Sequence, residues 1–185
     1  MEKALDGAVR VFRERGYHAT SVTDLQEATA LAAGSIYKAF KDKRAVFLAA
    51  LDRYVSRREE ARGAALLSSG TGRDGLREFL NAYVELSSGA EGRLGCLVVA
   101  SAVELATFDD ELARRIKGAL SRSETLLADL IRKGQADGSV TSDFDGEAAA
   151  RLMLCIMQGM RVIGKTGRTK EEMTAVVDLA LKIID

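Results

Sequence analysis

The segment from Gly16 to Leu48 constrains the fold of this chain more than any other, because its pattern predicts two short helices, a tight turn between them and a third helix directly after. Ser21 and Asp24 have the spacing of a capping box, in which the hydroxyl accepts a backbone N–H and the carboxylate accepts one in return. A helix therefore begins at this point. Its apolar residues fall on one face: Val22, Leu25 and Ala28.

The second short helix is predicted to run from Ala33 to Phe40. Ile36 and Phe40 are four residues apart, so both side chains can be buried on the same face. Ser35 and Lys38 then lie on another face, with Gly34 at the leading end. This arrangement is typical of a helix-turn-helix that meets DNA, but a helix pair that only packs in an all-helical protein has the same apolar spacing. The pattern alone leaves both interpretations open.

The first fifty residues also follow a specific order. They are Ala8, Phe12, Gly16 and Tyr17, then Thr20, Ser21, Val22 and Leu25, then Gly34, Ser35, Ile36, Tyr37 and Phe40, and finally Lys43. This order resembles the N-terminal domain of the TetR family of bacterial transcriptional repressors. The resemblance covers a little over a quarter of the chain, and the remaining residues are similar to the family in being helical and of the expected length.

The chain departs from the family pattern in three places. Ala30 stands where the family usually has a turn glycine, and we expect strain there if the position needs a positive φ angle. Ala32 stands where the family usually has a serine cap, whose loss costs on the order of 1 kcal/mol. Few residues precede the first helix. These departures concern the detailed geometry of the turn.

The resemblance implies that the helix from Ala33 to Phe40 lies in the major groove. Ser35 and Lys38 are then expected to face bases and the nearest phosphates, while Ala33 and Gly34 let the backbone come close. Thr20, Ser21, Tyr37 and Lys43 are expected to hold backbone phosphates, two of them at helix N-termini. Few long side chains are available to read bases, so specificity is expected to depend on Lys38 and on DNA shape.

Composition fits an all-α protein. The chain of 185 residues has no proline, which favours long uninterrupted helices. We expect a three-helix N-terminal domain at residues 1–47 and a roughly six-helix C-terminal domain at residues 48–185. The two cysteines lack the spacing of a zinc site and are too few for a disulfide scaffold, so no metal and no cofactor is expected. Without a secretory signal or a membrane-spanning segment, a soluble cytoplasmic protein is predicted.

The formal net charge is zero, but the charge is not evenly distributed. Residues 1–62 hold twelve Lys and Arg against nine Asp and Glu, and the remainder holds fifteen against eighteen. A modest positive excess at the N-terminal end fits a small domain that meets DNA and a larger one that does not.

Catalysis is not expected. The chain has one histidine, His18, so no Cys-His or Ser-His pair can form within the C-terminal domain. No glycine-rich phosphate loop follows a strand. Glu104 lies inside the most apolar segment, Cys96 to Ala106, where a carboxylate needs a partner. An ion pair with an arginine and a contact with a ligand are both open for it.

The C-terminal domain is predicted to hold an effector site. Helices at about residues 43–67, 74–88, 96–106, 109–137, 146–166 and 170–184 follow from the apolar periodicity, with a loop at 89–95. The residues predicted to point inward suit a mostly apolar small molecule and are Phe79, Tyr83, Val99, Val103, Leu120 and Met157. Tyr83 and Glu104 could orient this ligand. A dry core without a cavity is the alternative.

Cys96 allows a second interpretation of the same scaffold, a thiol sensor of oxidants or electrophiles, because some TetR-type proteins have a similar Gly-Cys pair. A buried cysteine is otherwise an inert apolar residue.

The last two helices are the candidates for dimerisation. Their apolar residues and one glycine that permits close approach are Leu152, Ile156, Gly159, Met160, Met173, Val177 and Ile184. In the alternative, these faces complete the core of the monomer.

The sequence thus predicts a ligand-responsive repressor with three partners: double-stranded operator DNA, a small-molecule effector and a second copy of the chain. The alternative from another class is a helical binding protein whose N-terminal domain has lost DNA affinity.

Overall fold

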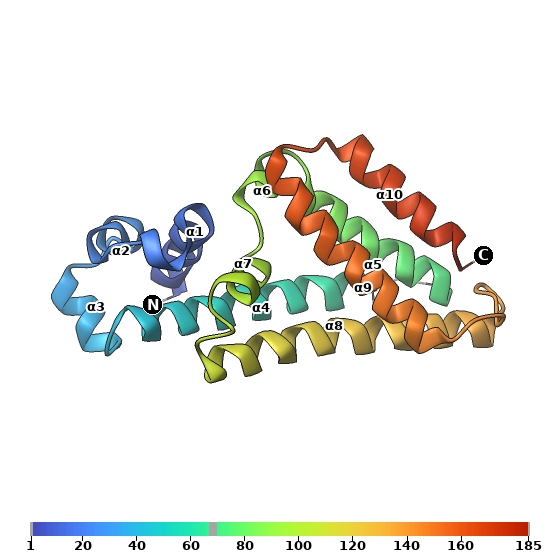
Figure 1. Ribbon diagram of the computed structural model, residues 1–185, viewed down its shortest axis with the longest axis horizontal. Helices are drawn as coiled ribbons and strands as arrows, with labels where there is room; N and C mark the ends of the chain where they lie inside the picture. Colours follow the sequence, from blue (N-terminus) through green and yellow to red (C-terminus); the bar gives the residue numbers. More distant parts are fainter. Residues whose placement is uncertain (1, 67–69, 185) are drawn as a thin grey trace. The chain divides into compact units, whose positions relative to one another are not determined.

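The protein is all-helical in a computed structural model that describes residues 2–66 and 70–184 (Figure 1). Within these residues there are ten α-helices, one short 3₁₀ helix and no strand. The all-α prediction is therefore confirmed. No helix in this part of the chain is long and apolar enough to cross a membrane.

The helices follow one another with short connections. The N-terminal ones are α1 (Glu2–Ala19), α2 (Val22–Thr29), α3 (Ala33–Ala39) and α4 (Lys43–Leu66). They are followed by α5 (Gly72–Ser87), α6 (Gly89–Leu94), α7 (Leu97–Glu104), α8 (Asp110–Asp137), α9 (Gly146–Ile163), the 3₁₀ helix η1 (Gly164–Thr166) and α10 (Lys170–Lys182).

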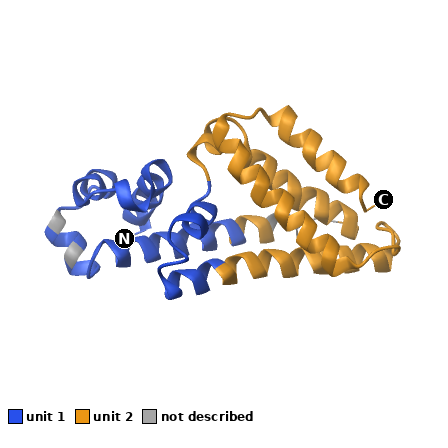
Figure 2. Ribbon diagram, in the orientation of Figure 1, with its two compact units in different colours: residues 1–59, 96–116 blue, residues 60–95, 117–185 orange. Residues whose placement is uncertain are grey.

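Two compact units share these helices (Figure 2). Unit 1 contains residues 1–59 and 96–116, and unit 2 contains residues 60–95 and 117–185. The division predicted at residue 47 falls inside α4, and α7 with the start of α8 lies in the same unit as the N-terminal helices.

Unit 1 is built around contacts of α1 with α2 and α7. Gly7 makes the first of these contacts possible, because a Cβ atom at this position would lie only 1.9 Å from the carbonyl oxygen of Ala28. Phe12 packs edge-on against Phe47 with ring centroids 4.9 Å apart, and Tyr17 does so at 5.0 Å. This aromatic cluster fixes the end of α1 against α4.

Unit 2 has its core between α5, α9 and α10, with α5 in contact with both of the others. Two helices begin with capping boxes, Thr71 with Asp74 and Thr169 with Glu172. Aliphatic and methionine side chains fill the core, among them Leu76, Leu80, Leu127, Ile131, Met153, Met160, Met173, Val177 and Ile184.

Two local expectations were wrong. The segment predicted as a loop at residues 89–95 contains the short helix α6. The segment predicted to be the most buried helix is α7, in which only Leu97 and Ser101 are buried. Because α7 is apolar nearly all round, its sequence has no periodic signal for the side that faces the core.

Candidate nucleic-acid interface

Helix α3 presents a face that does not belong to the core. Ile36 is buried beneath it, while Gly34, Ser35 and Lys38 are exposed. A Cβ atom at Gly34 would have no neighbour within 4 Å, so another backbone can approach here. The side chains of Ala33 and Tyr37, two further predicted contacts, lie outside the described residues. The exposed face agrees with the spacing in the sequence, and its contact with DNA stays a prediction.

The turn before α3 has the two unfavourable features that the sequence indicated, a left-handed alanine and a helix N-cap without a side-chain hydrogen bond. Ala30 ends α2 with φ 56° and ψ 28°, in the left-handed region. An L-residue with a Cβ atom is strained in this conformation, and glycine is not. Ala32 occupies the N-cap of α3 and provides no side-chain hydrogen bond to the helix.

The start of α2 has the predicted capping box. The Ser21 hydroxyl accepts from the Asp24 backbone N–H at 3.1 Å, and an Asp24 carboxylate oxygen accepts from the Ser21 backbone N–H at 2.8 Å. Backbone and side-chain hydrogen bonds from Ser21 hold the pKa of Asp24 below its usual value. Ser21 is exposed, so a phosphate contact from this position stays a prediction.

Thr20 and Lys43 do not have the free side chains expected of phosphate ligands. Thr20 is buried, and its hydroxyl donates to the carbonyl of Gly16 at 2.6 Å. The Lys43 ammonium donates to the carbonyls of Tyr17 and Thr20, both at 3.0 Å, and lies 4.5 Å from the centre of the Tyr17 ring. In this structure both side chains close the end of α1, and the two phosphate contacts stay predictions.

An acidic residue also lies at the start of α4. Asp42 accepts from the Ala45 backbone N–H at 2.8 Å and so caps the helix next to Lys43. A carboxylate therefore lies at the helix N-terminus from which Lys43 was predicted to contact a phosphate. Asp42 three residues before Ala45 was the signal in the sequence for this cap.

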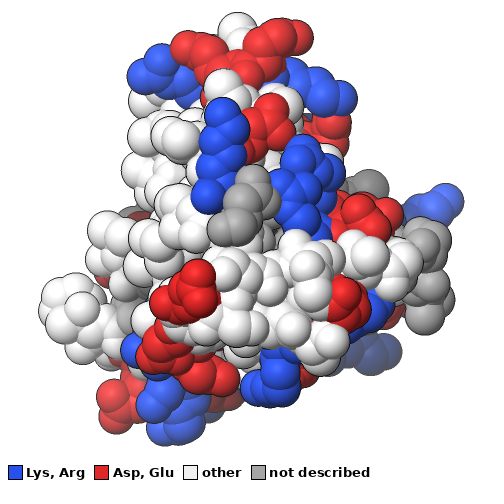
Figure 3. Space-filling model, turned by 90° about the vertical axis from the view of Figure 1, so that its right-hand side faces the viewer, with Lys and Arg blue, Asp and Glu red and all other residues white. Residues whose placement is uncertain are grey.

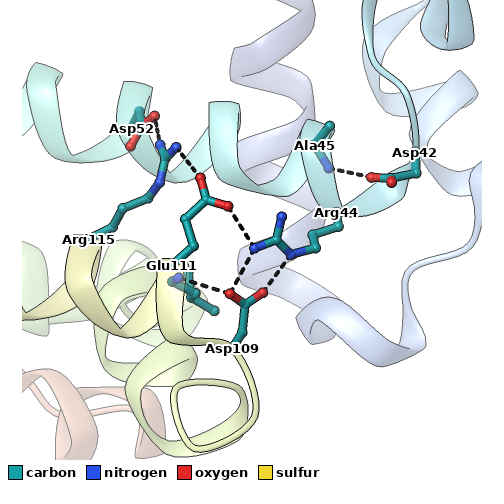
Figure 4. Close-up of polar contacts among 8 residues, drawn as sticks. Asp42, Arg44, Ala45, Asp52, Asp109, Glu111 and Arg115 are labelled. Carbon is teal, nitrogen blue, oxygen red and sulfur yellow. Dashed lines mark hydrogen bonds and ion pairs between the residues drawn. The ribbon is translucent and has the colours of Figure 1, made fainter.

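An ion-pair network links α4 to the start of α8 inside unit 1 (Figure 4). Arg44 donates to Asp109 through Nε at 2.6 Å and Nη2 at 2.8 Å, and Nη2 also donates to Glu111 at 2.9 Å. Arg115 continues the network to Glu111 and to Asp52 on α4.

This network changes the titration of its acids. The hydrogen bond from Arg44, followed by the Leu112 backbone N–H, holds the pKa of Asp109 far below its usual value. Hydrogen bonds from Arg115 and then Arg44 lower the pKa of Glu111. Sequence reasoning missed this network, because residues 44 and 109 are linked only by the tertiary fold.

Glu104 at the end of α7 contacts the end of α1, also within unit 1. One of its carboxylate oxygens accepts from the His18 backbone N–H at 3.4 Å and lies 3.8 Å from Nε2 of the same histidine. Glu104 is partly exposed, so the expectation of a carboxylate inside a buried helix was wrong. Its partner is a histidine and a backbone amide of the N-terminal segment.

The predicted effector residues fall in two groups. Phe79, Tyr83 and Met157 belong to the core of unit 2, and Leu120 is partly buried in the same unit. The Tyr83 hydroxyl accepts from Arg62 at 3.1 Å, a partner that sequence reasoning missed. Cys96, Val99 and Glu104 are partly exposed in unit 1.

Val103 was predicted to point inward, and this was wrong, because its side chain is 83% exposed. It stands on the side of α7 away from the buried Leu97 and Ser101.

The residues predicted to form the dimer interface also fall in two groups, one buried and one at the surface. Met160, Met173, Val177 and Ile184 are buried in the core of unit 2, so their assignment to an outer face was wrong. Leu152 and Gly159 are exposed and Ile156 is partly buried. Sequence reasoning missed four more exposed apolar residues on α9 and directly around α10: Val162, Ile163, Leu179 and Ile183. Figure 3 shows one face of the molecule, on which an area without Lys, Arg, Asp or Glu lies between groups of charged side chains.

Two family models match the chain. "Bacterial regulatory proteins, tetR family" matches residues 4–50, and "Tetracyclin repressor-like, C-terminal domain" matches residues 72–179. The matched segments contain the exposed face of α3 and most of unit 2.

Curated relatives are similar in sequence to this chain along most of their length. The chain is 27% identical to the HTH-type transcriptional repressor ComR of Escherichia coli (strain K12) over 98% of its own length and 87% of the relative. It is 26% identical to the transcriptional regulator YezE of Bacillus subtilis (strain 168) over 98% and 94%.

Solved structures give the same result. A cysteine mutant of the TetR family regulator CifR, complexed with a 26-base-pair operator, is 29% identical and superimposes with a TM-score of 0.88 over 100% of this chain and 96% of that one. A TetR regulator from Rhodococcus sp. RHA1 is 31% identical, with a TM-score of 0.65 over 98% and 97%. The chain therefore belongs to the TetR family, as a DNA-binding transcriptional regulator.

Proposed function

We propose that this protein is a repressor that binds its operator as a homodimer and is released by a small-molecule effector. The observation that carries the proposal is the face of α3, where Gly34, Ser35 and Lys38 are exposed above the buried Ile36. Each α3 helix lies in the major groove of one half-site. Such a protein acts where the chromosome lies, in the bacterial cytoplasm.

The side chains on the exposed face of α3 determine how the protein recognises its operator sequence. Of Gly34, Ser35 and Lys38, only Lys38 has a long side chain, and it contacts a base or the adjacent phosphate. Ser35 and the Ser21 hydroxyl add short polar contacts, while Gly34 allows close backbone approach. With so few long side chains, DNA shape contributes to recognition.

The apolar residues exposed on α9 and around α10 support the dimer. Leu152, Leu179 and Ile183 are 42%, 65% and 51% exposed, and a Cβ atom at Gly159 would have no neighbour within 4 Å. An extended apolar surface of this kind marks a protein interface. In a homodimer the same surface of two copies meets across a two-fold axis.

In this proposal, release depends on the contacts that α7 and the start of α8 make within unit 1. Glu104 contacts the end of α1, and Asp109 holds Arg44 at the start of α4. Movement of the segment between α7 and α8 therefore shifts α1 and α4, the helices before and after the helix-turn-helix of α2 and α3. We call α3 the reading helix, because it is the one proposed to contact bases. The effector must prefer the conformation in which the two α3 helices no longer match the half-sites, because only differential affinity shifts the balance.

The effector site that we propose lies in unit 2, at Phe79, Tyr83 and Met157. Apolar and aromatic side chains with a few polar groups suit a small, mostly apolar molecule. Arg62 donates to Tyr83 and lies 5.5 Å from the centre of the Phe79 ring, so it adds a positive charge beside these residues. Helix α8 continues from unit 2 into unit 1 and can transmit the change.

A footprint of the intergenic DNA upstream of the gene tests this function. The expected result is one protected near-palindrome with half-site centres roughly 34 to 36 Å apart or a multiple of that distance. Binding no tighter than to unrelated DNA of the same length would contradict it and would favour the helical binding protein without DNA affinity.

A thiol sensor is the second candidate, because Cys96 is partly exposed at the N-cap of α7, whose other end contacts α1. Alkylation with iodoacetamide tests it. Release of DNA that is lost in Cys96→Ser but kept in Cys155→Ser, the exposed cysteine on α9, would support the sensor. Unchanged DNA binding after complete alkylation of Cys96 would exclude it.

A further inference from the structure

Arg161 on α9 is a buried cation with incomplete hydrogen bonding. Its side chain is 2% exposed, and Nη2 donates to the carbonyl of Gly95 at 2.7 Å. Nε and Nη1 are buried without a hydrogen-bond partner among the described residues. Guanidinium is always charged and has five N–H donors, three of them on these two atoms. A buried charge normally has a partner.

The surroundings of Arg161 contain a second buried polar atom without a partner. Ser87 is completely buried at the end of α5, and its hydroxyl makes no hydrogen bond within the described part of the chain. It belongs to the junction at which α5, α6 and η1 meet, because a Cβ atom at Gly164 or Gly92 would lie 2.2 or 2.6 Å from the Ser87 carbonyl oxygen. Arg161 lies one helical turn before Gly164, so both residues with unpartnered polar atoms border this junction.

A second cation, Lys165, lies beside Gly95. The Lys165 side chain passes within 3.3 to 3.7 Å of the position that a Cβ atom would take at Gly95. Over the described ranges, neither Lys165 nor Arg161 has an ion pair. The acids Glu85 on α5, Glu91 on α6 and Glu172 on α10 have other interactions, Glu85 with Lys170 and Glu172 with Arg168.

We propose that Arg161, which the Gly95 carbonyl holds in place, and Lys165 form a binding site for a small carboxylate. The planar guanidinium matches a carboxylate in shape and in the number of hydrogen bonds. The Gly95 carbonyl takes one N–H of Nη2, which leaves the N–H groups of Nε and Nη1 and the second N–H of Nη2 for the ligand. Lys165 is exposed, and its side of the junction is the route of entry.

The ligand class extends the proposed effector from a mostly apolar molecule to one with an acidic end. In that respect the inference rests on the proposed function. The binding itself does not, since it concerns residues of unit 2 and is measured without DNA.

Thermal unfolding of the full chain, followed by circular dichroism, tests the site. Sodium acetate, sodium phosphate and sodium chloride are titrated at constant ionic strength and pH 7. We expect acetate to raise the unfolding midpoint saturably, by about 5 to 10 °C at roughly a hundred times its dissociation constant. Phosphate and chloride should give smaller rises.

Two variants and a matched control test whether the acetate response comes from Arg161 and Lys165. Arg161→Gln keeps a donor for the Gly95 carbonyl but removes the charge, so the acetate response should be lost. Lys165→Gln, on the exposed side, should weaken acetate binding several-fold and gives a result even if the buried variant does not fold. Arg151→Gln removes an exposed arginine of the same helix and should respond like the wild type.

An equal acetate response in wild type and both variants would overturn the site. So would the absence of any response in the wild type, and a response to phosphate or chloride as large as that to acetate would overturn the choice of a carboxylate. Failure of operator binding in a separate mobility-shift assay would leave the acetate result unchanged, so the two proposals fail independently.

Discussion

Arg44 donates two hydrogen bonds to the carboxylate of Asp109, at 2.6 and 2.8 Å, and so ties the first turn of α4 to the start of α8. The same carboxylate accepts from the Leu112 backbone N–H at 3.0 Å and caps α8. The Asp109 side chain therefore caps the start of α8 and also holds α4, the helix that follows α3. This double role makes Asp109 the residue at which acid should affect unit 1 most directly.

Asp109→Asn should reduce the dependence of stability on acid pH. The pKa of Asp109 is lower in the folded chain than in the unfolded chain, chiefly because of Arg44. Its contribution is thus present above the unfolded pKa of about 4 and is lost as the pH falls toward the folded value. Urea unfolding at pH 7 and pH 3 measures the difference, which should be smaller in the variant.

Asp143→Asn is the control for this measurement, since Asp143 is exposed and no ion pair of it is found in the described part of the chain. An acid dependence in Asp109→Asn as steep as in the wild type would contradict the role of the Arg44 contact.

Ala30→Gly should stabilise the protein by about 1 kcal/mol, because glycine adopts the left-handed conformation without the strain of a Cβ atom. The matched control is Ala136→Gly on the exposed side of α8, which should destabilise by about 0.5 to 1 kcal/mol. Chemical unfolding curves give both values. Equal destabilisation by the two glycines would mean that residue 30 is not strained in solution.

Gly7→Ala should destabilise unit 1 by about 2 kcal/mol or more, because the new methyl group would meet the Ala28 carbonyl at 1.9 Å and push α1 away from α2. DNA binding should weaken with it. Gly63→Ala on α4 is the control, where nothing lies within 4 Å and a gain of about 1 kcal/mol is expected from helix propensity. If Gly7→Ala were as stable as the wild type, the close approach of the two helices would be incorrect.

Leu152→Glu combined with Leu179→Glu should convert the proposed dimer to a monomer, because each places a charge within an exposed apolar surface that the second copy would cover. Multi-angle light scattering at micromolar concentration measures the mass. Val103→Glu, at an even more exposed apolar position on α7, should remain dimeric. A monomeric wild type would remove the dimer from the proposal.

Local signals predicted the N-terminal helices well. The spacing of Ser21 and Asp24 located the start of α2, and the four-residue spacing of Ile36 and Phe40 separated the buried side of α3 from its exposed side. These features depend on residues within one turn of each other, so the sequence contains the information.

Tertiary contacts could not be predicted in the same way. Met160 and Leu152 both lie on apolar stretches of α9, and only the packing of α5 and α10 decides that the first is buried and the second exposed. Lys43 has the composition of a phosphate ligand, yet its ammonium binds carbonyls that the fold brings to it from the end of α1. The sequence around Arg161 did not indicate that this arginine is buried, because its burial follows from the tertiary junction around Gly95.

The affinity of Lys38→Ala for the upstream intergenic DNA, measured by fluorescence anisotropy over a series of salt concentrations, tests the reading role of α3 most directly. A base contact should cost about 1 to 3 kcal/mol and relax specificity, whereas a phosphate contact should weaken all sequences about equally and lower the salt slope by about one. Lys117→Ala, which removes the same charge from the exposed side of α8, should bind like the wild type. Wild-type affinity and an unchanged salt slope in Lys38→Ala would contradict the placement of α3 in the major groove.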